Sequence, residues 1–318
     1  MSSWENFVPE KLHQKCCRML LSVHKKTSRL AVLGELGQYP LFIKSVSHCL
    51  NYKLHLNLKQ DPRSILGSLM TEMRTMADKN QDCWLTRVQK IEKLFNTPKP
   101  SKTSGKIILS ALRAKFELHW HEQVNKVKLG PDNKNHNKLR TYSTLKQSFG
   151  QEPYIKLVRN RNQRMHLTRL RTSAHNLGIE QGRYRNIPVE KRICAYCSPS
   201  ATQRTTSPPP QSTAPSSTPR SAQATRPPPQ APSVDSELHF LNQCPIFKTN
   251  RNCFYGKFSS LDPSFVYLVE EEKCRRLLCP KTAQEAKLTN KFIKIMFDWR
   301  GKIDDGISVD NLVIYFVN

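Results

Sequence analysis

The sequence predicts a mainly α-helical fold, built as an irregular array of many helices. Three observations predict it: apolar residues recur at spacings of three and four, strand patterns are sparse, and no internal repeat is evident. At 318 residues the chain is long enough to bury a core and to form two or three modest domains or one long helical domain. By composition we divide it into 1–96, an N-terminal helical region, 102–192, a basic helical region, 193–250, a split cysteine-rich module, and 251–318, a C-terminal helical region.

The N-terminal region is predicted to form several amphipathic helices. From Glu10 to about Lys59 the pattern is helical, with a turn at GELGQYP (34–40), where two glycines and a proline interrupt it. Asp61-Pro62 predicts an N-cap with proline at the first helical position, and a further helix is expected from about 82 to 95. The apolar faces are expected to contain Leu12, Cys16, Met19, Leu20, Val23, Leu41, Ile43, Val46 and Leu50, and then Ile65, Leu66, Leu69 and Met73.

Three further segments complete the helical prediction. After a linker at 97–105, a long helix is expected from Ile107 to Val127. Thr282-x-x-Glu285 is a capping box that predicts the start of a C-terminal helix, and the last residues, LVIYFVN, are β-prone or a docked apolar tail. The residues expected to be buried are Leu109, Leu112, Phe116, Trp120 and Val124, then Leu167, Leu170, Ala174 and Leu177, and finally Phe292, Ile295, Met296 and Trp299.

The charge of the chain indicates a polyanionic partner. There are 51 Lys and Arg against 25 Asp and Glu, a net charge of +26, and nucleic acid is the first expectation for such a field. The opening residues lack a secretion signal, and no apolar run is long enough to span a membrane, so we expect an intracellular protein without a membrane partner. The ten cysteines are too scattered for a disulfide framework, and most, such as Cys16, Cys49 and Cys83, are expected to be buried apolar residues.

A low-complexity insert interrupts the cysteine-rich module. The stretch Pro199 to Ser233 consists mostly of Ser, Pro, Thr and Gln and includes two PPP runs at 208–210 and 227–229. Such a composition buries too little apolar surface to offset the entropy lost on ordering. We therefore predict a disordered Pro/Ser/Thr-rich insert over 198–235.

Cysteines and a histidine on the two sides of this insert have the spacing of metal ligands. Cys194 and Cys197 form a Cys-x2-Cys pair, and His239 and Cys244 form a His-x4-Cys pair that one short helix could present on adjacent turns. Three thiolates and one imidazole suit a structural zinc ion, because they close a tetrahedron and leave no position open. The alternative, that the cysteines are incidental and His239 is a capping or surface histidine, stays open; the competing ligands are His175, Cys253, Cys274 and Cys279.

The long separation between the two pairs does not rule the site out. Lengthening a flexible loop from roughly eight residues to about forty costs about 1.5 kcal/mol. A structural zinc ion contributes roughly 10 kcal/mol or more to folding. The predicted fold class is therefore a mainly α, irregular multi-helix array with a small zinc-stabilised C-terminal module and a disordered insert.

The segment from Tyr154 to Arg192 is rich in arginine and has few acidic residues. A solvated basic face is the simplest interpretation, but helix-local salt bridges are scarce, and the planar guanidinium fits phosphate oxygens. Tyr154 or Tyr184 could add contacts or stacking. The candidates for nucleic-acid binding are Arg159, Arg161, Arg164, Arg169, Arg171, Arg183 and Arg185.

Five stretches form a recognisable combination: GELGQYPLFIKSV (34–46), LRTYSTLKQSFGQEPYI (139–155), LTRLRTSAHNLGIEQGRYR (167–185), PVEKRICAYC (188–197) and ELHFLNQCP (237–245). Together they resemble the region C-terminal to the reverse transcriptase domain in proteins of animal non-LTR retrotransposons. The resemblance extends from about Leu12 to Trp299.

The resemblance implies a zinc site and a nucleic-acid-binding role. Cys194, Cys197, His239 and Cys244 match the ligands of the family's Cys-Cys-His-Cys cluster, and Arg169, Arg171 and Arg183 lie in its basic tract. In the family this region grips template RNA or target DNA during target-primed reverse transcription. The range 1–96 would correspond to the part that follows the polymerase thumb.

Two departures from the family pattern limit what the resemblance implies. The spacer between the two ligand pairs is much longer here, because the Pro/Ser/Thr-rich insert lies in it. The paired-aspartate motif of the polymerase is missing, and two-metal nucleotidyl transfer requires clustered carboxylates. The acidic runs 270–272 and 304–305 are most simply solvated faces, so we expect no enzymatic activity from this chain.

The sequence thus predicts a nucleic-acid-binding protein, stabilised by one structural zinc ion, that does not polymerise. RNA and DNA are both candidate partners, and the expected location is the nucleus or a cytoplasmic ribonucleoprotein. Two alternatives stay open. The chain could be a helical interaction module whose proline-rich insert binds SH3- or WW-type domains, or an accessory piece of an enzyme encoded upstream.

Overall fold

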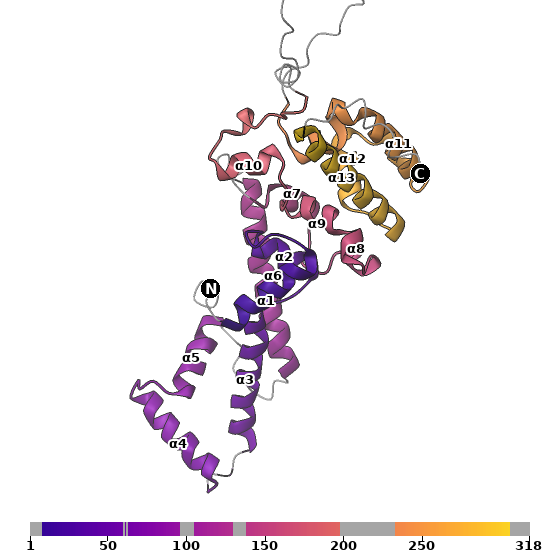
Figure 1. Cartoon of the computed structure of the whole chain (residues 1–318). Helices are drawn as coiled ribbons and strands as arrows, with labels where there is room; N and C mark the ends of the chain where they lie inside the picture. The colour runs from indigo at the N-terminus through magenta and orange to yellow at the C-terminus, as the bar shows by residue number, and fades with distance from the viewer. Residues whose placement is uncertain are drawn as a thin grey trace, which may run out of the picture.

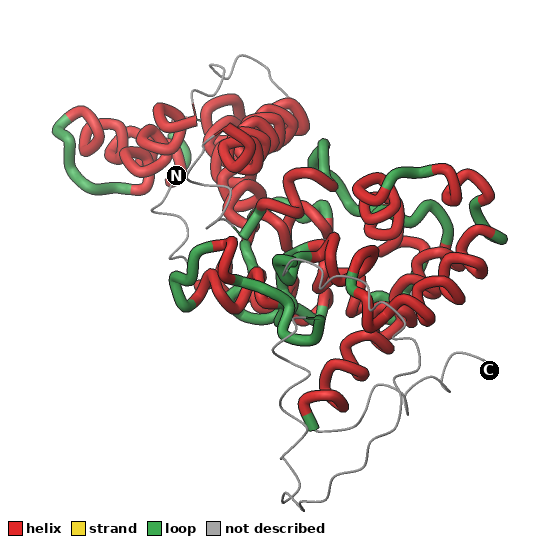
Figure 2. The backbone as a smooth tube through the Cα atoms, turned by 90° about the horizontal axis from the view of Figure 1, so that it is seen from above, coloured by secondary structure: helices red, strands yellow, loops and turns green. Residues whose placement is uncertain are grey.

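The computed structural model describes residues 8–59, 61, 63–95, 105–129, 138–197 and 233–305. Within these ranges the chain is mainly helical and forms no strand, only two isolated β-bridges, which confirms the predicted fold class (Figures 1 and 2). The linker after residue 95, most of the insert (198–232) and the terminal LVIYFVN lie outside the described residues. The α-helices are α1 (Val8–Leu21), α2 (Arg29–Leu36), α3 (Leu41–Lys59), α4 (Ile65–Asp78), α5 (Trp84–Phe95), α6 (Gly105–Leu129), α7 (Arg140–Leu145), α8 (Pro153–Leu157), α9 (Met165–Arg171), α10 (Gly178–Tyr184), α11 (Lys248–Ser259), α12 (Glu270–Leu278) and α13 (Ala283–Asp304).

The helices form an elongated array with α2 near its centre (Figure 1). The long helices α3 and α6 lie side by side and lead towards α4 and α5 at one end, whereas α11, α12 and α13 form the other end. The indole of Trp120 on α6 donates a hydrogen bond of 2.9 Å to the carbonyl oxygen of Leu30. This bond joins the long helix to the central one.

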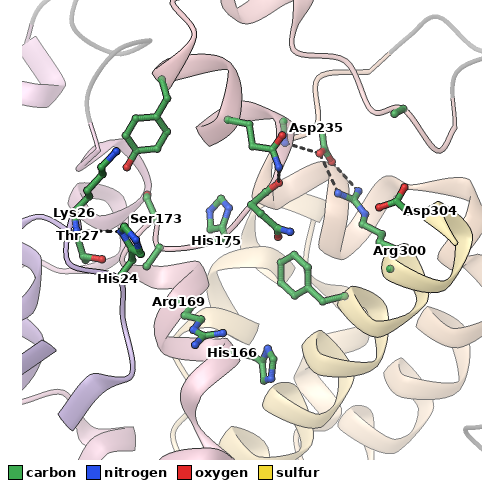
Figure 3. Close-up of a pocket in the computed structure, with 18 of the residues that line it drawn as sticks. His24, Lys26, Thr27, His166, Arg169, Ser173, His175, Asp235, Arg300 and Asp304 are labelled. Carbon is green, nitrogen blue, oxygen red and sulfur yellow. Dashed lines mark hydrogen bonds and ion pairs between the residues drawn. The ribbon is translucent and has the colours of Figure 1, made fainter. Parts of the chain in front are cut away.

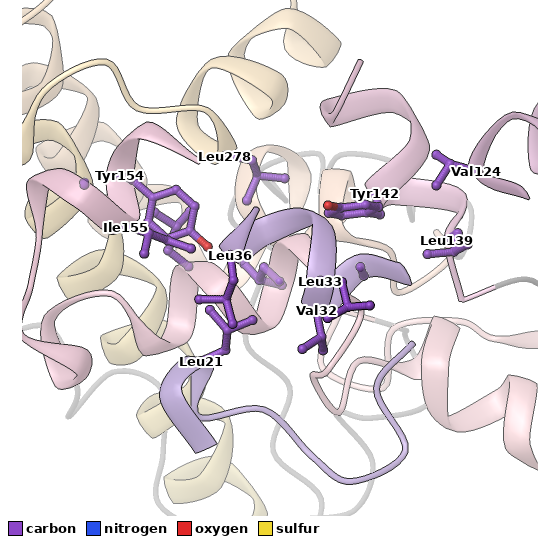
Figure 4. Packing of buried hydrophobic residues seen from close by; sticks show 14 of the residues in the cluster. Leu21, Val32, Leu33, Leu36, Val124, Leu139, Tyr142, Tyr154, Ile155 and Leu278 are labelled. Carbon is purple, nitrogen blue, oxygen red and sulfur yellow. The ribbon is translucent and has the colours of Figure 1, made fainter. Parts of the chain in front are cut away.

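Helix α2 is buried along most of its length. Every residue from Ala31 to Leu36 is buried, and its leucines pack against residues from distant parts of the chain, among them Tyr154 and Leu278 (Figure 4). Buried residues from all four ranges defined by composition belong to this one core cluster. The core therefore runs from the N-terminal helices to α13.

Three of the motifs singled out in the sequence meet at one buried point. Glu35, in GELGQYP, accepts hydrogen bonds from Tyr154 (2.6 Å) and from Arg171 (2.9 Å). Arg171 also donates to Glu152 (2.6 Å). Two of these segments approach closely at Gly37. Its φ of +61° and its lack of a Cβ allow the backbone at Gln151 to pack directly against it. The residues of these three motifs that meet here therefore stabilise the fold.

The buried face of α1 differs from the predicted one. Glu10, Cys17 and Leu21 face inward, whereas Leu12 is 62% exposed and Met19, Leu20 and Cys16 are also exposed. The cause is the carboxylate of Glu10, which accepts from the backbone N–H of Leu41 (2.8 Å) and from Arg29 (3.3 Å) and so fixes the rotation of the helix. The expectation of burial was also wrong for Cys49 and Cys83, which are only partly buried.

The start and the face of α4 also differ from the prediction. Ser64 is the N-cap, and its hydroxyl accepts from the N–H of Gly67 at 3.1 Å. Asp61 instead forms the turn before it, because its carboxylate accepts from the N–H of Arg63. The residues of α4 that are buried are Gly67, Met70 and Ala77, whereas Ile65, Leu66 and Leu69 are exposed.

Other helix predictions are confirmed. On α6 four of the predicted core residues, Leu112, Phe116, Trp120 and Val124, are buried, whereas Leu109 is only partly buried. Helix α13 begins at the predicted capping box, in which Thr282 accepts from the N–H of Glu285 at 3.2 Å and the Glu285 side chain bonds back. The sequence signals for both helices are local, so these helices can be predicted without knowing which distant residues pack against them.

Candidate metal centre and basic surface

The predicted metal ligands converge. The ligand atoms of Cys194, Cys197, His239 and Cys244 all lie within 4.8 Å of one another, and the Cys197 sulfur lies 3.3 Å from Nε2 of His239. A tetrahedral ion with bonds of about 2.3 Å to sulfur and about 2.0 Å to nitrogen requires ligand separations of roughly 3.5–3.8 Å. The four residues can therefore hold one metal ion, despite the insert between the two pairs.

A short backbone bridge brings the two ligand pairs together. Ile193 and Val234 form an antiparallel bridge, in which Cys194 donates its N–H to Ser233 (2.9 Å) and Asp235 donates to Arg192 (2.8 Å). The predicted limit of the insert at 235 is therefore wrong, since 233–235 are ordered and paired. The bridge joins the two ends of the insert next to the ligands.

The second pair is presented by a π-helical turn, η5 (His239–Gln243), instead of by adjacent α-helical turns. The N–H of Cys244 donates to the carbonyl oxygen of His239 at 2.7 Å, which closes a loop of five residues. In this geometry His239 and Cys244, which are five residues apart, lie on the same side of the turn. Phe240 and Leu241 point into the core and anchor the turn.

Arg300 on α13 and Asp235 support the metal centre, and sequence reasoning missed both. The guanidinium of Arg300 donates to the two carboxylate oxygens of Asp235 at 2.7 and 3.0 Å and contacts the sulfur of Cys194 at 3.6 Å. It also lies over the rings of Tyr196 and Phe240, at 4.6 and 4.7 Å from their centroids. A single sequence carries no signal that pairs residues so far apart, and Asp235 had been assigned to the insert.

Hydrogen bonds and burial shift the pKa values of the three thiols in the cluster in different directions. The hydrogen bond from Cys244 lowers the pKa of Cys194 to about 3 against the effect of burial, and His239 and Arg300 act in the same direction. Burial, followed by the charge of Cys194, raises the pKa of Cys197 to about 12, and the pKa of Cys244 is also raised, first by its hydrogen bond to Cys194. The thiol of Cys194 is thus the one of the three that ionises most readily, and a cation among the sulfurs would ease ionisation of the other two.

The competing ligands have other surroundings. His175 contacts a carboxylate oxygen of Glu237 at 2.9 Å, and the sulfur of Cys279 accepts from Arg171 at 3.2 Å. Cys274 is buried among apolar residues, and Cys253 is exposed. Among the residues that the structure describes, only the four predicted ligands form a group able to hold a metal ion.

The predicted nucleic-acid-binding arginines differ in their exposure. Arg159, Arg161 and Arg185 are exposed, and Arg169 and Arg183 are partly buried. Arg164 is buried and donates to backbone carbonyl oxygens, including those of Arg159 (2.7 Å) and Leu20 (3.3 Å). Arg171 is fully buried in the network with Glu35. The guanidinium groups of these two arginines serve the fold, so the candidates for a nucleic-acid contact narrow to the other five.

The two tyrosines proposed for stacking differ in the same way. Tyr154 is buried, and its hydroxyl is bonded to Glu35, so its ring is not available to a base. Tyr184, at the end of α10, is 52% exposed. Of these two tyrosines, only Tyr184 is placed where its ring can contact a ligand.

The described part of the chain contains no helix that combines the length and the apolar character needed to cross a membrane. Comparisons with protein-family models, with curated proteins and with solved structures found no match. Function is therefore inferred from the residues themselves.

Proposed function

We propose that this protein binds nucleic acid, is stabilised by one structural zinc ion, and corresponds to the C-terminal portion of a non-LTR retrotransposon reverse transcriptase protein. The observation that carries the proposal is the combination of an excess of positive charge with a Cys-Cys-His-Cys cluster that directly follows the basic helices α8 to α10. The protein would bind RNA or DNA without polymerising it.

Zinc fits the cluster better than a hard cation does. Three thiols and one imidazole are soft and borderline ligands, which zinc prefers, whereas magnesium and calcium prefer oxygen. Four protein ligands leave no position open for a substrate, so the ion would hold the fold together and would not take part in a reaction. Cys194, Cys197, His239 and Cys244 would hold it.

The exposed arginines support binding to a phosphate backbone. Arg159 follows α8, Arg161 begins the short 3-10 helix η2 (Arg161–Gln163), and Arg185 follows α10. All three are exposed, although Arg161 also donates to the carbonyl oxygen of Met19 at 3.3 Å. Guanidinium groups bind phosphate oxygens in a planar, two-pronged manner. Contacts of this kind read little sequence and weaken steeply with salt, because binding releases counterions.

We propose a binding role and not a catalytic one. The acidic run Glu270–Glu272 forms the first turn of α12, where negative charge stabilises the amino terminus of a helix. Asp304 accepts a hydrogen bond of 2.9 Å from the hydroxyl of Tyr196. These positions have ordinary structural explanations, and neither suggests a pair of catalytic carboxylates.

Metal analysis of the purified protein tests the zinc site. We expect about one zinc ion per chain and loss of structure on prolonged treatment with a strong chelator. Replacing Cys194 or Cys244 with serine should abolish zinc retention, whereas Cys253→Ser, at an exposed cysteine outside the cluster, should retain it. A folded wild-type protein that contains no zinc would remove the site.

A binding assay tests the nucleic-acid role. Fluorescence anisotropy with labelled RNA and DNA should show affinity that falls at least tenfold between about 50 and 200 mM salt. The triple variant Arg159→Gln/Arg161→Gln/Arg185→Gln should bind more weakly than a matched triple variant of exposed lysines, Lys11→Gln/Lys79→Gln/Lys287→Gln. Equal losses in the two variants would show that the basic segment is not the binding surface.

A further inference from the structure

A cavity of about 740 Å³ lies between the basic helices and the metal module (Figure 3). Its walls come from the loop between α1 and α2, from α9 and α10, from the segment around Tyr196, and from the end of α13. A volume of this size is typical of pockets that hold small molecules or one unit of a polymer. The cavity was not predicted from the sequence, because its residues come from six separate stretches, 24–27, 138, 166–184, 193–196, 235 and 297–304.

Basic side chains dominate the charge of this cavity. Lys26, Lys138 and Arg169 line it. The two acidic residues in its walls are both bonded: Asp235 accepts from Arg300 and from the N–H of Gly178, and Asp304 accepts from Tyr196. The cavity therefore suits an anion.

An exposed aromatic ring lies among the cations. Lys26, Lys138 and Arg183 lie 5.3, 5.5 and 4.2 Å from the centroid of the Tyr184 ring. Three cations around one tyrosine form a positive group next to an apolar surface. Phe297 and His166 add two more rings to the lining, with their centroids 6.5 Å apart.

Two buried hydroxyls in the wall lack partners. Thr27 and Ser173 are both nearly fully buried and line the cavity, and the Oγ1 of Thr27 and the Oγ of Ser173 make no hydrogen bond. Figure 3 shows both residues at the cavity, beside Lys26 and above Arg169. Buried polar groups are normally satisfied, so these two hydroxyls point to a polar ligand atom at this place.

We propose that this cavity binds one nucleotide unit of a single-stranded nucleic acid, an inference that rests on the proposed function. The phosphate would lie among Lys26, Lys138 and Arg169, and the hydroxyls of Thr27 and Ser173 would donate to its oxygens. The base would contact the rings that line the cavity, among them the exposed ring of Tyr184. A single strand fits and a duplex does not, because only an unpaired base can leave the stack and enter the pocket.

Anisotropy with a labelled ten-nucleotide single strand and a matched blunt-ended duplex of two strands tests the cavity. The double variant Lys26→Gln/Lys138→Gln should weaken binding of the single strand roughly 5- to 50-fold and binding of the duplex much less. Lys11→Gln/Lys79→Gln, the same charge change at exposed lysines outside the cavity, should cost the single strand less than about twofold. Equal losses for the two double variants would overturn the proposal.

Two single substitutions separate the ring from the hydroxyl. Tyr184→Phe should retain single-strand binding, and Tyr184→Ala should lose it by roughly 5-fold or more. Ser173→Ala should weaken binding about 2- to 10-fold, because it removes a donor to the ligand without disturbing a bond in the protein. Wild-type affinity in both Tyr184→Ala and Ser173→Ala would overturn the proposal and leave the proposed function intact.

The strand must also be distinguished from a free nucleotide. Calorimetry with AMP and with inorganic phosphate tests whether a small ligand alone occupies the cavity. We expect AMP to bind weakly, to compete with the single strand, and to lose its binding in Lys26→Gln/Lys138→Gln. If AMP binding depends on these lysines while oligonucleotide binding does not, the assignment to a strand is overturned. If the wild-type protein binds no nucleic acid at low salt, the proposed function itself fails.

Discussion

Arg171 and Glu35 lie 136 residues apart in the sequence and form a fully buried ion pair in the fold. The guanidinium donates to Glu35 at 2.9 and 3.1 Å, to Glu152 at 2.6 Å and to the carbonyl oxygen of Leu278 at 2.6 Å. One side chain thus joins α2, α9, α12 and the segment before α8. A buried charge with this many partners ties the N-terminal helices to the C-terminal ones.

Replacing Arg171 with methionine should therefore destabilise the whole fold. Removing Arg171 leaves the carboxylate of Glu35 fully buried without its cation, whereas Glu152 keeps its ion pair with Lys146. The loss costs roughly 3–5 kcal/mol in the free energy of unfolding. Chemical denaturation, monitored by circular dichroism, measures this change in the free energy of unfolding. Arg161→Met, at an exposed arginine ten residues earlier, is the control and should change stability by less than about 0.5 kcal/mol. Similar stabilities for the two variants would contradict the structural role of Arg171.

Two glycines inside helices should respond to alanine in opposite directions. A Cβ at Gly34 would clash with the Tyr142 hydroxyl and approach the Trp120 ring to 2.9 Å, so Gly34→Ala should cost about 1–3 kcal/mol. A Cβ at Gly256 would meet nothing within 4 Å, so Gly256→Ala should stabilise α11 by about 0.5–1 kcal/mol. Melting temperatures of the two variants test the packing of α2 against α6 and α7. A neutral effect of Gly34→Ala would contradict it.

The acid stability of the protein should depend in part on Glu285. Burial alone would raise the pKa of this carboxyl, but hydrogen bonds from Arg276 and from the N–H of Lys281, together with the charge of Arg276, hold it below its ordinary value. The carboxylate therefore stabilises the fold above the pKa that it has in the unfolded chain. This contribution is lost as the pH falls from about 5 through the lowered pKa of the folded state.

Glu285→Gln tests that contribution. The substitution should cost about 1–3 kcal/mol at pH 7 and little at low pH, so the acid limb of stability against pH becomes flatter. Denaturation curves between pH 7 and 3 measure the effect. Glu271→Gln, at an exposed glutamate of α12, should leave the acid limb unchanged. A parallel shift at every pH would mean that Glu285 acts only as a cap.

Shortening the insert should preserve the metal centre. The bridge at Cys194 and Ser233 already joins its two ends, so replacing 200–231 with about six Gly and Ser residues keeps both ligand pairs in place. Loop closure then costs less, and stability should rise by about 1 kcal/mol. Zinc content and the melting temperature check this. Loss of zinc in the shortened protein would show that the insert itself takes part in the site.

The sequence by itself determined the helices with strong local signals and the four residues that come close enough together to hold a metal ion. The apolar stripe of α6 and the capping box of α13 depend on residues within a few turns, and the Cys-x2-Cys and His-x4-Cys spacings fix which side chains can chelate an ion together. These features involve only neighbours along the chain.

The tertiary structure alone decided which charged residues face inward. The rotation of α1 follows from Glu10 and its bonds to Arg29 and Leu41, and the burial of Arg171 follows from Glu35. A buried charge needs a partner, and that partner lies far away in the sequence, so no local pattern shows the pair. The same holds for the cavity around Lys26, Lys138 and Ser173, because its chemistry exists only where the separate stretches meet.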